Sequence, residues 1–401
     1  MIRLLDVAYP QDLYRELEQV GVAREAWEIF RQKSAVRAVK ITGLSVAGAN
    51  ILKQTALVVG GDCAVHRETI SGKVRKTDAI LFATERQIKE ICRRLSQQPE
   101  CARRLGLALS EVVACELSAG RVLKIGKRRL NLSTRVHIMG ILNVTPDSFY
   151  DGGRYFEVAR AVEQGIKLAE EGADIIDIGA ESTRPGSTPV PENEQLRRLL
   201  PVVKNLARKV KVPISVDTTS AAVAEAALDA GARMVNDISG LNFDDKMAQV
   251  VARARVPVIV MHIKGRPRTM QRNPQYQDLM AEIFSFLAAS IKRAVDAGIA
   301  PDNILVDPGI GFGKTAAHNW EILRRLKELR NLEKPIVIGP SRKSFIGAVL
   351  NLPPEERLEG TIAACLIAAA NGADIVRVHD VKAVCRALAV MDAIYRPQPG
   401  G

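Results

Sequence analysis

From about residue 137 onward, short apolar runs alternate with longer amphipathic stretches. The runs are rich in Val and Ile and show little alternation with polar residues, as expected for strands that are buried on both faces. There are eight of them: His137–Asn143, Asp174–Gly179, Pro213–Asp217, Arg233–Asp237, Pro257–His262, Ile304–Asp307, Pro335–Gly339 and Ile375–Val378. The stretches between them have helical spacing, for example Glu157–Glu171, Glu192–Lys209, Met280–Ala297 and His318–Leu329. Eight such units predict a closed parallel (β/α)8 TIM barrel; an open doubly wound sheet, the alternative, rarely needs eight strands.

Two further regions precede these units. Arg121–Ser133 contains two short alternating runs around Gly126 and Lys127, which predict a β-hairpin that plugs the bottom of the barrel. Residues 1–120 mix helical segments with strand-like runs and predict a small α/β or α+β domain. The helical segments are Pro10–Phe30 and Glu85–Gln98, and the strand-like runs are Val36–Thr42, Thr55–Val59 and Asp78–Ala83. We therefore expect an N-terminal extension (1–120), a barrel (121–395) and a frayed tail (396–401).

The composition is that of an ordinary globular protein, with 47% hydrophobic and 25% charged residues. No apolar run is long enough to span a membrane, and no charged-then-apolar leader opens the chain, so we expect no membrane association and no secretion. The six cysteines form no C-x-x-C pair, which predicts neither a zinc site nor a disulfide framework. Together these features predict a cytoplasmic protein with reduced thiols.

The formal net charge of +12 raises the question of a nucleic-acid partner. Residues 1–130 carry 23 Lys and Arg against 14 Asp and Glu, whereas the rest of the chain carries 34 against 31. No sequence pattern of a known nucleic-acid-binding module accompanies this basic region. We therefore interpret it as a solvated surface and do not expect nucleic acid to be a partner.

Nearly every apolar run of the predicted barrel ends in a polar or charged side chain. In a parallel barrel these ends converge at one mouth, where the active sites of this fold lie. An ionisable group at the end of a buried run is costly unless it is paired or meets a ligand. Any one of these polar residues could cap a helix, but polar residues at the ends of eight strands, all at one mouth, predict a site. The residues are Asn143, Asp177–Glu181, Asp217, Asn236, Asp237, His262, Asp307, Ser341, Lys343, Arg377 and His379.

The residue types indicate what this site binds. Asp217, Asn236, Asp307 and Lys343 combine carboxylates, an amide and an ammonium, a set that suits a flat heterocycle with amino, ring N–H and carbonyl groups. A second set, Arg184, Arg377 and His379, provides cationic donors for a phosphate or diphosphate. The amide oxygen of Asn143 suits Mg²⁺ held mainly by phosphate oxygens. A ring with a diphosphate implies group transfer with pyrophosphate as the leaving group.

Three loops add detail to this picture. Asn143–Gly153 and Glu181–Pro191 are polar, rich in Gly, Pro, Ser and Thr, and are suited to close over a substrate, although they could be solvated connectors. Asp307–Thr315 is rich in glycine, but it matches neither the Walker A loop nor the dinucleotide-binding G-x-G-x-x-G pattern. We interpret it as a turn at the barrel mouth that presents Phe312.

Eight motifs, in order along residues 121–395, resemble the dihydropteroate synthase family of folate biosynthesis. They are Ile141–Gly153 (ILNVTPDSFYDGG), Asp177–Gly186 (DIGAESTRPG), Ser215–Thr218 (SVDT), Asn236–Gly240 (NDISG), Met261–Gln271 (MHIKGRPRTMQ), Asp307–Lys314 (DPGIGFGK), Ser341–Gly347 (SRKSFIG) and Arg377–Val381 (RVHDV). One such motif would be weak support, whereas eight in order with similar spacing are specific.

The resemblance implies a reaction and a set of binding residues. Dihydropteroate synthases join 6-hydroxymethyl-7,8-dihydropterin pyrophosphate to 4-aminobenzoate, giving 7,8-dihydropteroate and pyrophosphate. By the same resemblance, the pterin is held by Asp217, Asn236, Asp307 and Lys343. The pyrophosphate is held by Thr183, Arg184, Arg377, His379 and, through Mg²⁺, Asn143. The aminobenzoate lies against Phe149, Pro185, Phe312 and Ser341.

The implied mechanism needs no covalent enzyme intermediate. Mg²⁺ and the cationic residues stabilise charge on the departing pyrophosphate, the methylene carbon becomes cation-like, and the aniline nitrogen attacks it. Asp151 and Asp217 could stabilise this positive charge, so the expected catalytic residues are Asp217, Lys343, Arg377, His379 and Asp151. The alternative is a methyltetrahydrofolate–corrinoid methyltransferase, which shares the pterin-binding positions but handles no pyrophosphate. The arginine-containing motifs disfavour it.

Residues 1–120 have no counterpart in this resemblance, and we interpret them as a packing or oligomerisation module. Asp62, Cys63 and His66 lie close together in the sequence, but a buried thiol beside a turn is the better interpretation than a metal site. An idle barrel that serves as a scaffold for a nucleic-acid-binding extension is a second alternative. The helical stretches Leu358–Asn371 and Val381–Ile394 are apolar enough to predict a homodimer.

Overall fold

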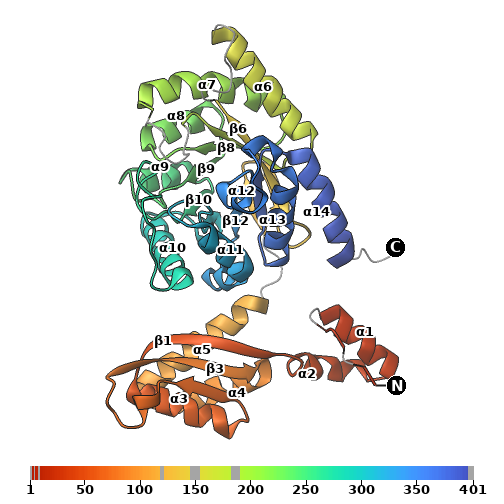
Figure 1. Cartoon of the computed structure of the whole chain (residues 1–401), viewed down its shortest axis with the longest axis vertical. Helices are drawn as coiled ribbons and strands as arrows, with labels where there is room; N and C mark the ends of the chain where they lie inside the picture. The colour runs from red at the N-terminus through yellow and green to blue at the C-terminus, as the bar shows by residue number, and fades with distance from the viewer. Residues whose placement is uncertain are drawn as a thin grey trace. The chain divides into compact units, whose positions relative to one another are not determined.

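The computed structural model describes residues 2–3, 5–7, 10–117, 122–144, 154–181 and 190–395. The chain divides into two compact units, Met1–Ser118 and Ala119–Gly401 (Figure 1). Five of the predicted site residues lie outside the described residues, and so does the predicted tail 396–401. These five are Phe149, Asp151, Thr183, Arg184 and Pro185.

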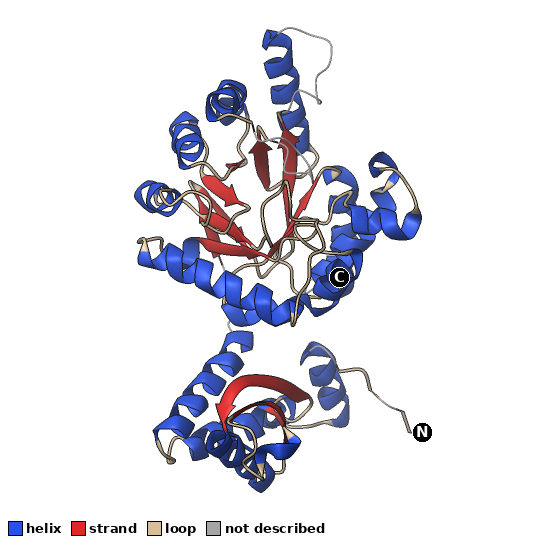
Figure 2. Ribbon diagram, turned by 60° about the vertical axis from the view of Figure 1, so that its left-hand side comes forward, coloured by secondary structure: helices blue, strands red, loops and turns tan. Residues whose placement is uncertain are grey.

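The second unit is a parallel (β/α)8 barrel, as predicted. Its eight strands follow the order β11-β10-β9-β8-β7-β6-β13-β12, and a parallel bridge between Val306 and Ile336 closes the circle between β11 and β12. Helices surround the strands on the outside (Figure 2). The strands are β6 (His137–Asn143), β7 (Ile175–Gly179), β8 (Ile214–Asp217), β9 (Met234–Asp237), β10 (Val258–Met261), β11 (Ile304–Asp307), β12 (Val337–Ile338) and β13 (Ile375–Val378).

The helices of the barrel begin and end at recognisable signals. Side chains cap three of their N-termini: Ser220 accepts a hydrogen bond from Val223 N, Asp278 from Ala281 N, and Thr315 from His318 N. The helices are α6 (Arg154–Glu170), α7 (Glu192–Lys209), α8 (Ala221–Ala230), α9 (Met247–Ala254), α10 (Leu279–Asp296), α11 (Ala316–Arg325), α12 (Ser344–Leu350), α13 (Leu358–Ala370) and α14 (Val381–Tyr395). The predicted helices over 157–171, 192–209, 280–297 and 318–329 correspond to α6, α7, α10 and α11, the last of which continues as a 3₁₀ helix.

The predicted hairpin is also present and plugs one end of the barrel. It consists of β4 (Val122–Ile125) and β5 (Arg128–Asn131), joined through Gly126 with a φ of 58°. Its apolar side chains form one buried cluster with a residue from seven of the eight barrel strands, near the strands' amino ends. The cluster contains Leu123, Ile125, Leu130, Leu132, Met139, Ile175, Met234, Ile259, Leu305, Val337 and Ile375. This plug leaves the carboxyl ends of the strands for the polar residues.

The first unit contains a three-stranded antiparallel sheet in the order β1-β3-β2. Its strands are β1 (Val36–Ser45), β2 (Asp62–Val65) and β3 (Lys76–Thr84), and its helices are α1 (Pro10–Val20), α2 (Trp27–Arg31), α3 (Val46–Val58), α4 (Glu85–Leu95) and α5 (Glu100–Leu117). Buried residues of α3, α4 and α5 pack on one face of the sheet. The prediction of a strand over Thr55–Val59 is wrong, because this run is the end of α3. There Leu52 and Ala56, four residues apart, face the core.

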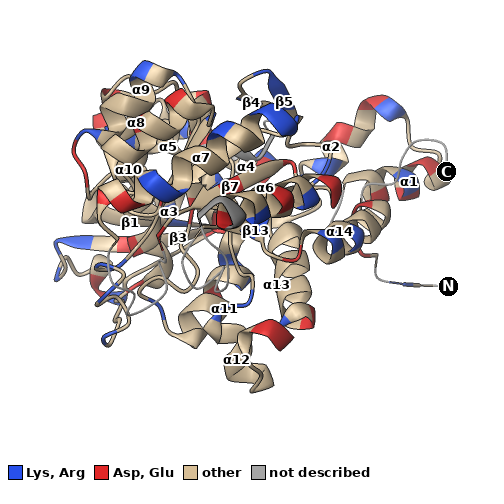
Figure 3. Cartoon of the chain, turned by 90° about the horizontal axis from the view of Figure 1, so that it is seen from above, with Lys and Arg blue, Asp and Glu red and all other residues tan. Residues whose placement is uncertain are grey.

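The structure locates the charge and the thiols of the chain more closely. Residues 1–118 carry 18 Lys and Arg against 14 Asp and Glu. Much of the basic excess of residues 1–130 therefore lies on the plug hairpin (Figure 3), where Lys124, Lys127, Arg128 and Arg129 are exposed. Cys63 is buried in β2, as its interpretation as a core thiol requires. Among the described residues, no helix is long and apolar enough to cross a bilayer.

Candidate active site

Four strand ends lie side by side at the mouth of the barrel. The register pairs Asn143 of β6 with Gly179 of β7, Gly179 with Asp217 of β8, and Asp217 with Asn236 of β9. The register thus places three polar residues in one row: Asn143, Asp217, which is 74 positions later in the sequence, and Asn236, a further 19 positions on. Asn143 and Asp217 are half-buried, and Asn236 is buried.

Arg377 joins two carboxylates at this mouth. Its Nε donates to Asp177 Oδ2 over 2.6 Å, and its Nη2 donates to Asp217 Oδ2 over 2.7 Å. Asn236 Nδ2 donates to the same Oδ2 of Asp177 over 3.0 Å. Four side chains from β7, β8, β9 and β13 therefore form one network, which we call the mouth network.

Asp177 was predicted to lie at the mouth, but it is the member of the mouth network to which the sequence assigned no binding or catalytic role. Its side chain is fully buried, and its Oδ1 has no hydrogen-bond partner among the described residues. Ser215 is paired with Asp177 in the β7–β8 register, and its Oγ also has no hydrogen-bond partner among the described residues. A buried polar atom without a partner is costly unless a ligand or water meets it. The position of Asp177 at a strand end was visible in the sequence, but its partners depend on the register.

The carboxylate of Asp217 sits where ionisation is unfavourable. Burial raises its pKa to about 7; Arg377 opposes this shift, while Asp177 adds to it. Burial alone would lower the pKa of Arg377, but Asp177 and Asp217 raise it, so the guanidinium stays charged. The mouth network can therefore exchange a proton near neutral pH at Asp217 while it keeps a fixed cation.

Asp307 and Lys343 form a second group beside this network. Asp307 ends β11, is buried, and accepts a hydrogen bond from Gly309 N over 2.6 Å. Burial raises the pKa of Asp307, and Lys343 opposes that shift. Lys343 is the N-cap of α12, and its Nζ donates to the carbonyl of Ile310. Burial lowers the pKa of Lys343 to about 8, against the opposing effect of Asp307.

Ser341 and His379 connect the ends of β12 and β13. Ser341 Oγ lies 3.0 Å from His379 Nδ1 and accepts the backbone N–H of His379 over 3.2 Å. Arg342, between Ser341 and Lys343, adopts a left-handed φ of 57° and pairs with Asp380 over 2.9 Å. The chain therefore turns sharply where it supplies two predicted site residues.

An apolar surface adjoins these polar groups. Phe312 is 9% exposed and forms a cluster with Ile238, Met261, Ile263 and Met270. Lys343 Nζ lies 4.8 Å from the centre of the Phe312 ring. A flat aromatic molecule could lie against this cluster while its polar groups reach the cation.

The described residues contain no group of three or more His, Cys, Asp or Glu side chains that could hold a metal ion. Asn143, the residue predicted to bind the metal, lies at the end of β6. A single amide oxygen fits a magnesium ion whose other ligands come from a substrate's phosphate groups and water. The described donor set therefore fits a substrate-held metal better than a protein-built metal centre.

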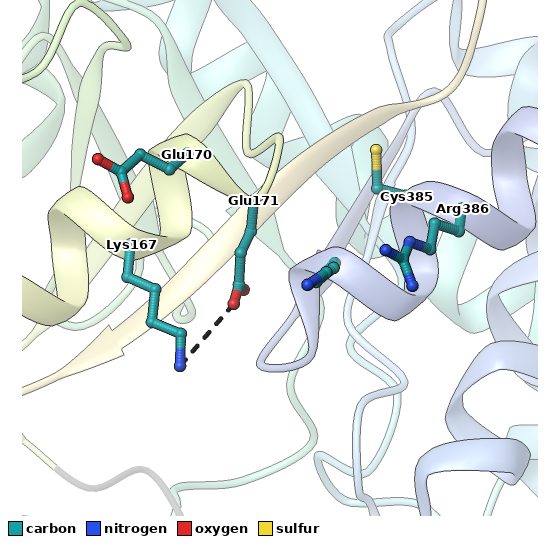
Figure 4. A pocket seen from close by; sticks show the side chains of 6 residues that line it. Lys167, Glu170, Glu171, Cys385 and Arg386 are labelled. Carbon is teal, nitrogen blue, oxygen red and sulfur yellow. Dashed lines mark ion pairs between the residues drawn. The ribbon is translucent and has the colours of Figure 1, made fainter.

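A pocket also occurs outside the barrel, between α6 and α14. It is lined by Lys167, Glu170, Glu171, Lys382, Cys385 and Arg386 (Figure 4). Lys167 and Glu171 form an ion pair across 3.9 Å, and charges of both signs are mixed along the wall. This mixture matches no single class of ligand, and we assign the pocket no role.

Comparison with known proteins bears on this site directly. The pterin binding enzyme family matches residues 139–379, which span all eight barrel strands except the first two residues of β6. A dihydropteroate synthase of Synechocystis is 48% identical over 275 residues, which cover 68% of this chain and 95% of that protein. The solved structure of Xanthomonas albilineans dihydropteroate synthase with 4-aminobenzoic acid is 45% identical, with a TM-score of 0.66, and covers 70% of this chain and all of that one.

A third relative reaches beyond the barrel. The probable bifunctional folylpolyglutamate synthase/dihydropteroate synthase of Haloferax volcanii is 39% identical over 379 residues, or 92% of this chain and 45% of that protein. Because this length exceeds that of the barrel unit, the similarity continues into the first unit. The family match and the two other relatives cover a share of the chain that corresponds to the barrel. By its barrel, its strand-end motifs and these similarities, the chain belongs to the dihydropteroate synthase family.

Proposed function

We propose that this protein is a transferase that condenses 6-hydroxymethyl-7,8-dihydropterin pyrophosphate with 4-aminobenzoate, releasing 7,8-dihydropteroate and pyrophosphate. The observation that carries the proposal is the mouth network of Asp177, Asp217, Asn236 and Arg377, with Asp307 and Lys343 beside it. This network combines the hydrogen-bonding groups of a pterin site with a fixed cation.

The pterin ring would lie among the carboxylates and the amide. Asp217 and Asp307 accept hydrogen bonds from amino and ring N–H groups, Asn236 can donate and accept, and Lys343 donates to a ring carbonyl or nitrogen. The partnerless Oδ1 of Asp177 is a further acceptor at the same depth. A bound ring that carries N–H donors would satisfy these groups, which supports a heterocycle in preference to an apolar ligand.

The diphosphate would lie toward Arg377 and His379. Arg377 uses two of its five N–H donors on Asp177 and Asp217, so it can also contact an anion, and the carboxylates hold its guanidinium in place. Asn143 would hold Mg²⁺ together with the phosphate oxygens. When bound there, the metal would supply positive charge that stabilises the departing pyrophosphate. We further propose that Thr183 and Arg184 add to this group and that Asp151 stabilises the methylene carbon.

The aminobenzoate would lie against Phe312, next to Ser341, with Phe149 and Pro185 from the two loops. Phe312 supplies an apolar surface for the ring. The aniline nitrogen is nucleophilic without deprotonation by the enzyme, so the chain need only orient it toward the methylene carbon and exclude water. The carboxylate of Asp217 would stabilise positive charge on the pterin as the pyrophosphate leaves.

A coupled assay for dihydropteroate, run with and without Mg²⁺, tests the proposal. Asp217→Asn and Lys343→Ala should raise the KM for the pterin substrate, whereas Arg377→Ala and His379→Ala should mainly weaken the contact with the diphosphate. Lys292→Met, on the exposed side of α10, is the matched control. Normal turnover in all four site variants would show that the site is assigned wrongly. A version that starts at Ala119 shows whether the first unit is needed.

We also propose that the protein forms a homodimer through the outer faces of α13 and α14. Ile367, Val390 and Ile394 on these helices are 49, 63 and 66% exposed, so two consecutive helices present large apolar side chains to the outside. Val390→Glu should then convert a dimer into a monomer in light scattering, whereas Val295→Glu on α10 should not.

We also propose a cytoplasmic location, which the free thiols at the described cysteines support.

A further inference from the structure

The turn that follows β11 has little conformational preference of its own. It runs from Gly309 to Gly313, and its three glycines have φ values of 68, 81 and 64°. Glycine adopts such values readily but loses much entropy when it is fixed in one of them. The turn also carries Phe312, the proposed contact for aminobenzoate. Its conformation must therefore be imposed by its surroundings.

Side chains impose that conformation through four consecutive carbonyl groups. The carbonyl of Ile310 accepts a hydrogen bond from Lys343 Nζ, that of Gly311 from Gln271 Nε2 over 2.6 Å, that of Phe312 from Lys314 Nζ over 2.9 Å, and that of Gly313 from Tyr276 Oη over 2.8 Å. Gln271 and Tyr276 come from the segment between β10 and α10. The turn is thus held from two neighbouring parts of the barrel mouth.

Lys314 differs from the other three donors because it is buried, with 3% of its surface exposed. Its Nζ also lies 2.8 Å from His262 Nδ1, directly after β10. Among the described residues it forms no ion pair, and burial lowers its pKa well below the usual value; Asp307 opposes this shift. Burial and Lys314 lower the pKa of His262 to about 2, so the imidazole is neutral and its Nδ1 can accept a hydrogen bond. Burial of an amine is costly, and the contacts of this amine with Phe312 and His262 must offset that cost. These contacts link the turn to the end of β10, which points to a role for the link.

The backbones of the two segments that Lys314 connects are in direct contact. A Cβ atom on Gly309 would lie 1.9 Å from the carbonyl oxygen of His262, and one on Gly313 would lie 2.6 Å from that of Lys264. No side chain fits between the turn and the end of β10. The pair Lys314–His262 therefore spans a contact that two glycines make possible.

We propose that Lys314 is a positioning residue, which acts through Phe312 to hold the aminobenzoate side of the site in its productive shape. This inference rests on the proposed function, because it assigns Phe312 to the amine substrate. Lys314 itself need not touch either substrate. Asp217, Asn236 and Arg377 on the pterin side lie on other strands and keep their contacts without it. Asp307 and Lys343 also bond to the turn, at Gly309 N and the Ile310 carbonyl, but neither bond involves Lys314.

The test uses the full chain with Lys314→Met, which keeps the length of the side chain and removes its donors. The KM for 4-aminobenzoate should rise about tenfold or more, while the KM for the pterin substrate changes less than about threefold. Hydrogen exchange at the amides of residues 309–313 should become at least about tenfold faster, with the rest of the barrel unchanged. Tyr276→Phe, which removes one donor to the same turn, should give the same pattern at about two- to fivefold. Lys292→Met, also on the barrel, should change none of these values.

The outcomes separate the two proposals. Wild-type protein that makes no dihydropteroate overturns the proposed function, and the exchange measurement still decides whether Lys314 holds the turn. Unchanged exchange in Lys314→Met, or equal rises in both KM values, overturns the positioning role. If Lys314→Met does not fold, Tyr276→Phe decides the matter by the same two measurements, and an unchanged turn in that variant overturns the proposal.

Discussion

The two ends of the barrel use the same residue type in opposite ways. At the plugged end, Asp174 and Asp374 each follow a Gly-Ala pair, accept hydrogen bonds from an arginine and accept a backbone N–H from a neighbouring segment. Asp374, for example, binds both terminal nitrogens of Arg330 at 3.0 Å and Ile336 N at 2.7 Å. At the mouth, Asp177 and Asp217 share the single Arg377, and one oxygen of Asp177 has no partner among the described residues.

The ionisation of Asp174 at the plugged end and of Asp217 at the mouth follows the same division. Burial opposes the charge on Asp174, but the neighbouring His137, whose Nδ1 lies 3.2 Å from Asp174 Oδ2, and the hydrogen bonds from Arg135 outweigh it and lower the pKa to about 2. At Asp217 burial prevails and raises the pKa to about 7. Carboxylates with complete partners stabilise the fold, whereas incompletely paired ones reduce its stability and are available to a ligand. The barrel therefore separates stability from chemistry along its axis.

The largest effect is expected when the mouth loses its carboxylate. Asp217→Asn keeps the shape of the side chain but removes the charge that binds the pterin and stabilises the methylene carbon. We expect kcat/KM for the pterin substrate to fall by about 10³-fold. The melting temperature at pH 8 should stay the same or rise, because the folded state no longer contains a buried carboxylate with a raised pKa. Steady-state kinetics with thermal unfolding measures both, and a large fall in melting temperature would contradict the division between the two ends.

The opposite result is expected at the plugged end. Asp374→Ala removes the buried carboxylate to which Arg330 and Ile336 N donate and should cost about 3 kcal/mol of folding free energy. The kcat of the molecules that remain folded should be unchanged. Chemical denaturation followed by loss of activity measures the first effect. Asp229→Ala, exposed on α8, is the control and should change neither value.

A change of pH should affect the two ends at different values. As the pH falls from 8 to 6, Asp217 takes up a proton, and kcat/KM for the pterin substrate should fall by about tenfold per unit below pH 7. Because the pKa of Asp217 is raised in the folded state, its contribution to stability has the opposite sign and is lost as the pH rises through about 7. The pKa of Asp174 is lowered, so its contribution is lost only as the pH falls toward 2. A pH profile of Asp217→Asn that kept the same midpoint would contradict this assignment.

The sequence predicted the architecture well because parallel strands buried on both faces leave a direct record in it. The bounds of β11 and β13 agree with their apolar runs, and the hairpin was evident from the turn at Gly126 and Lys127. The strand over Thr55–Val59 was predicted wrongly, since a short apolar run fits a strand and the end of a helix equally well. The surrounding residues of α3 decide the matter through contacts with the sheet.

The candidate site could be predicted only in part. Strand-end position identified Asp217, Asn236, Asp307 and Arg377, because all parallel strands end at the same mouth. The sequence could not show that Arg377 would bind two carboxylates, since that depends on the registers that connect β13 through β6 to β7 and β8. It also gave Lys314 no role, because the glycine-rich segment that contains it matches neither of the two nucleotide-binding patterns. The link between Lys314 and His262 joins residues 52 positions apart and appears only in the folded chain.

The smallest expected effect is a test of the plug. Ile125 is 1% exposed and lies in the cluster that closes the amino ends of the strands. Ile125→Val removes one methylene from this cluster and should cost about 1 kcal/mol of folding free energy. Both KM values and kcat should remain unchanged, because the plug and the mouth are separated by the layer of strand side chains between them. Val122→Ala on the same strand is the matched control, since Val122 is 42% exposed and should contribute little. Denaturation of the barrel, followed by loss of activity, measures the difference. If Ile125→Val lowered kcat more than it lowered stability, the plug would influence the chemistry at the mouth, and the two ends could not be regarded as independent.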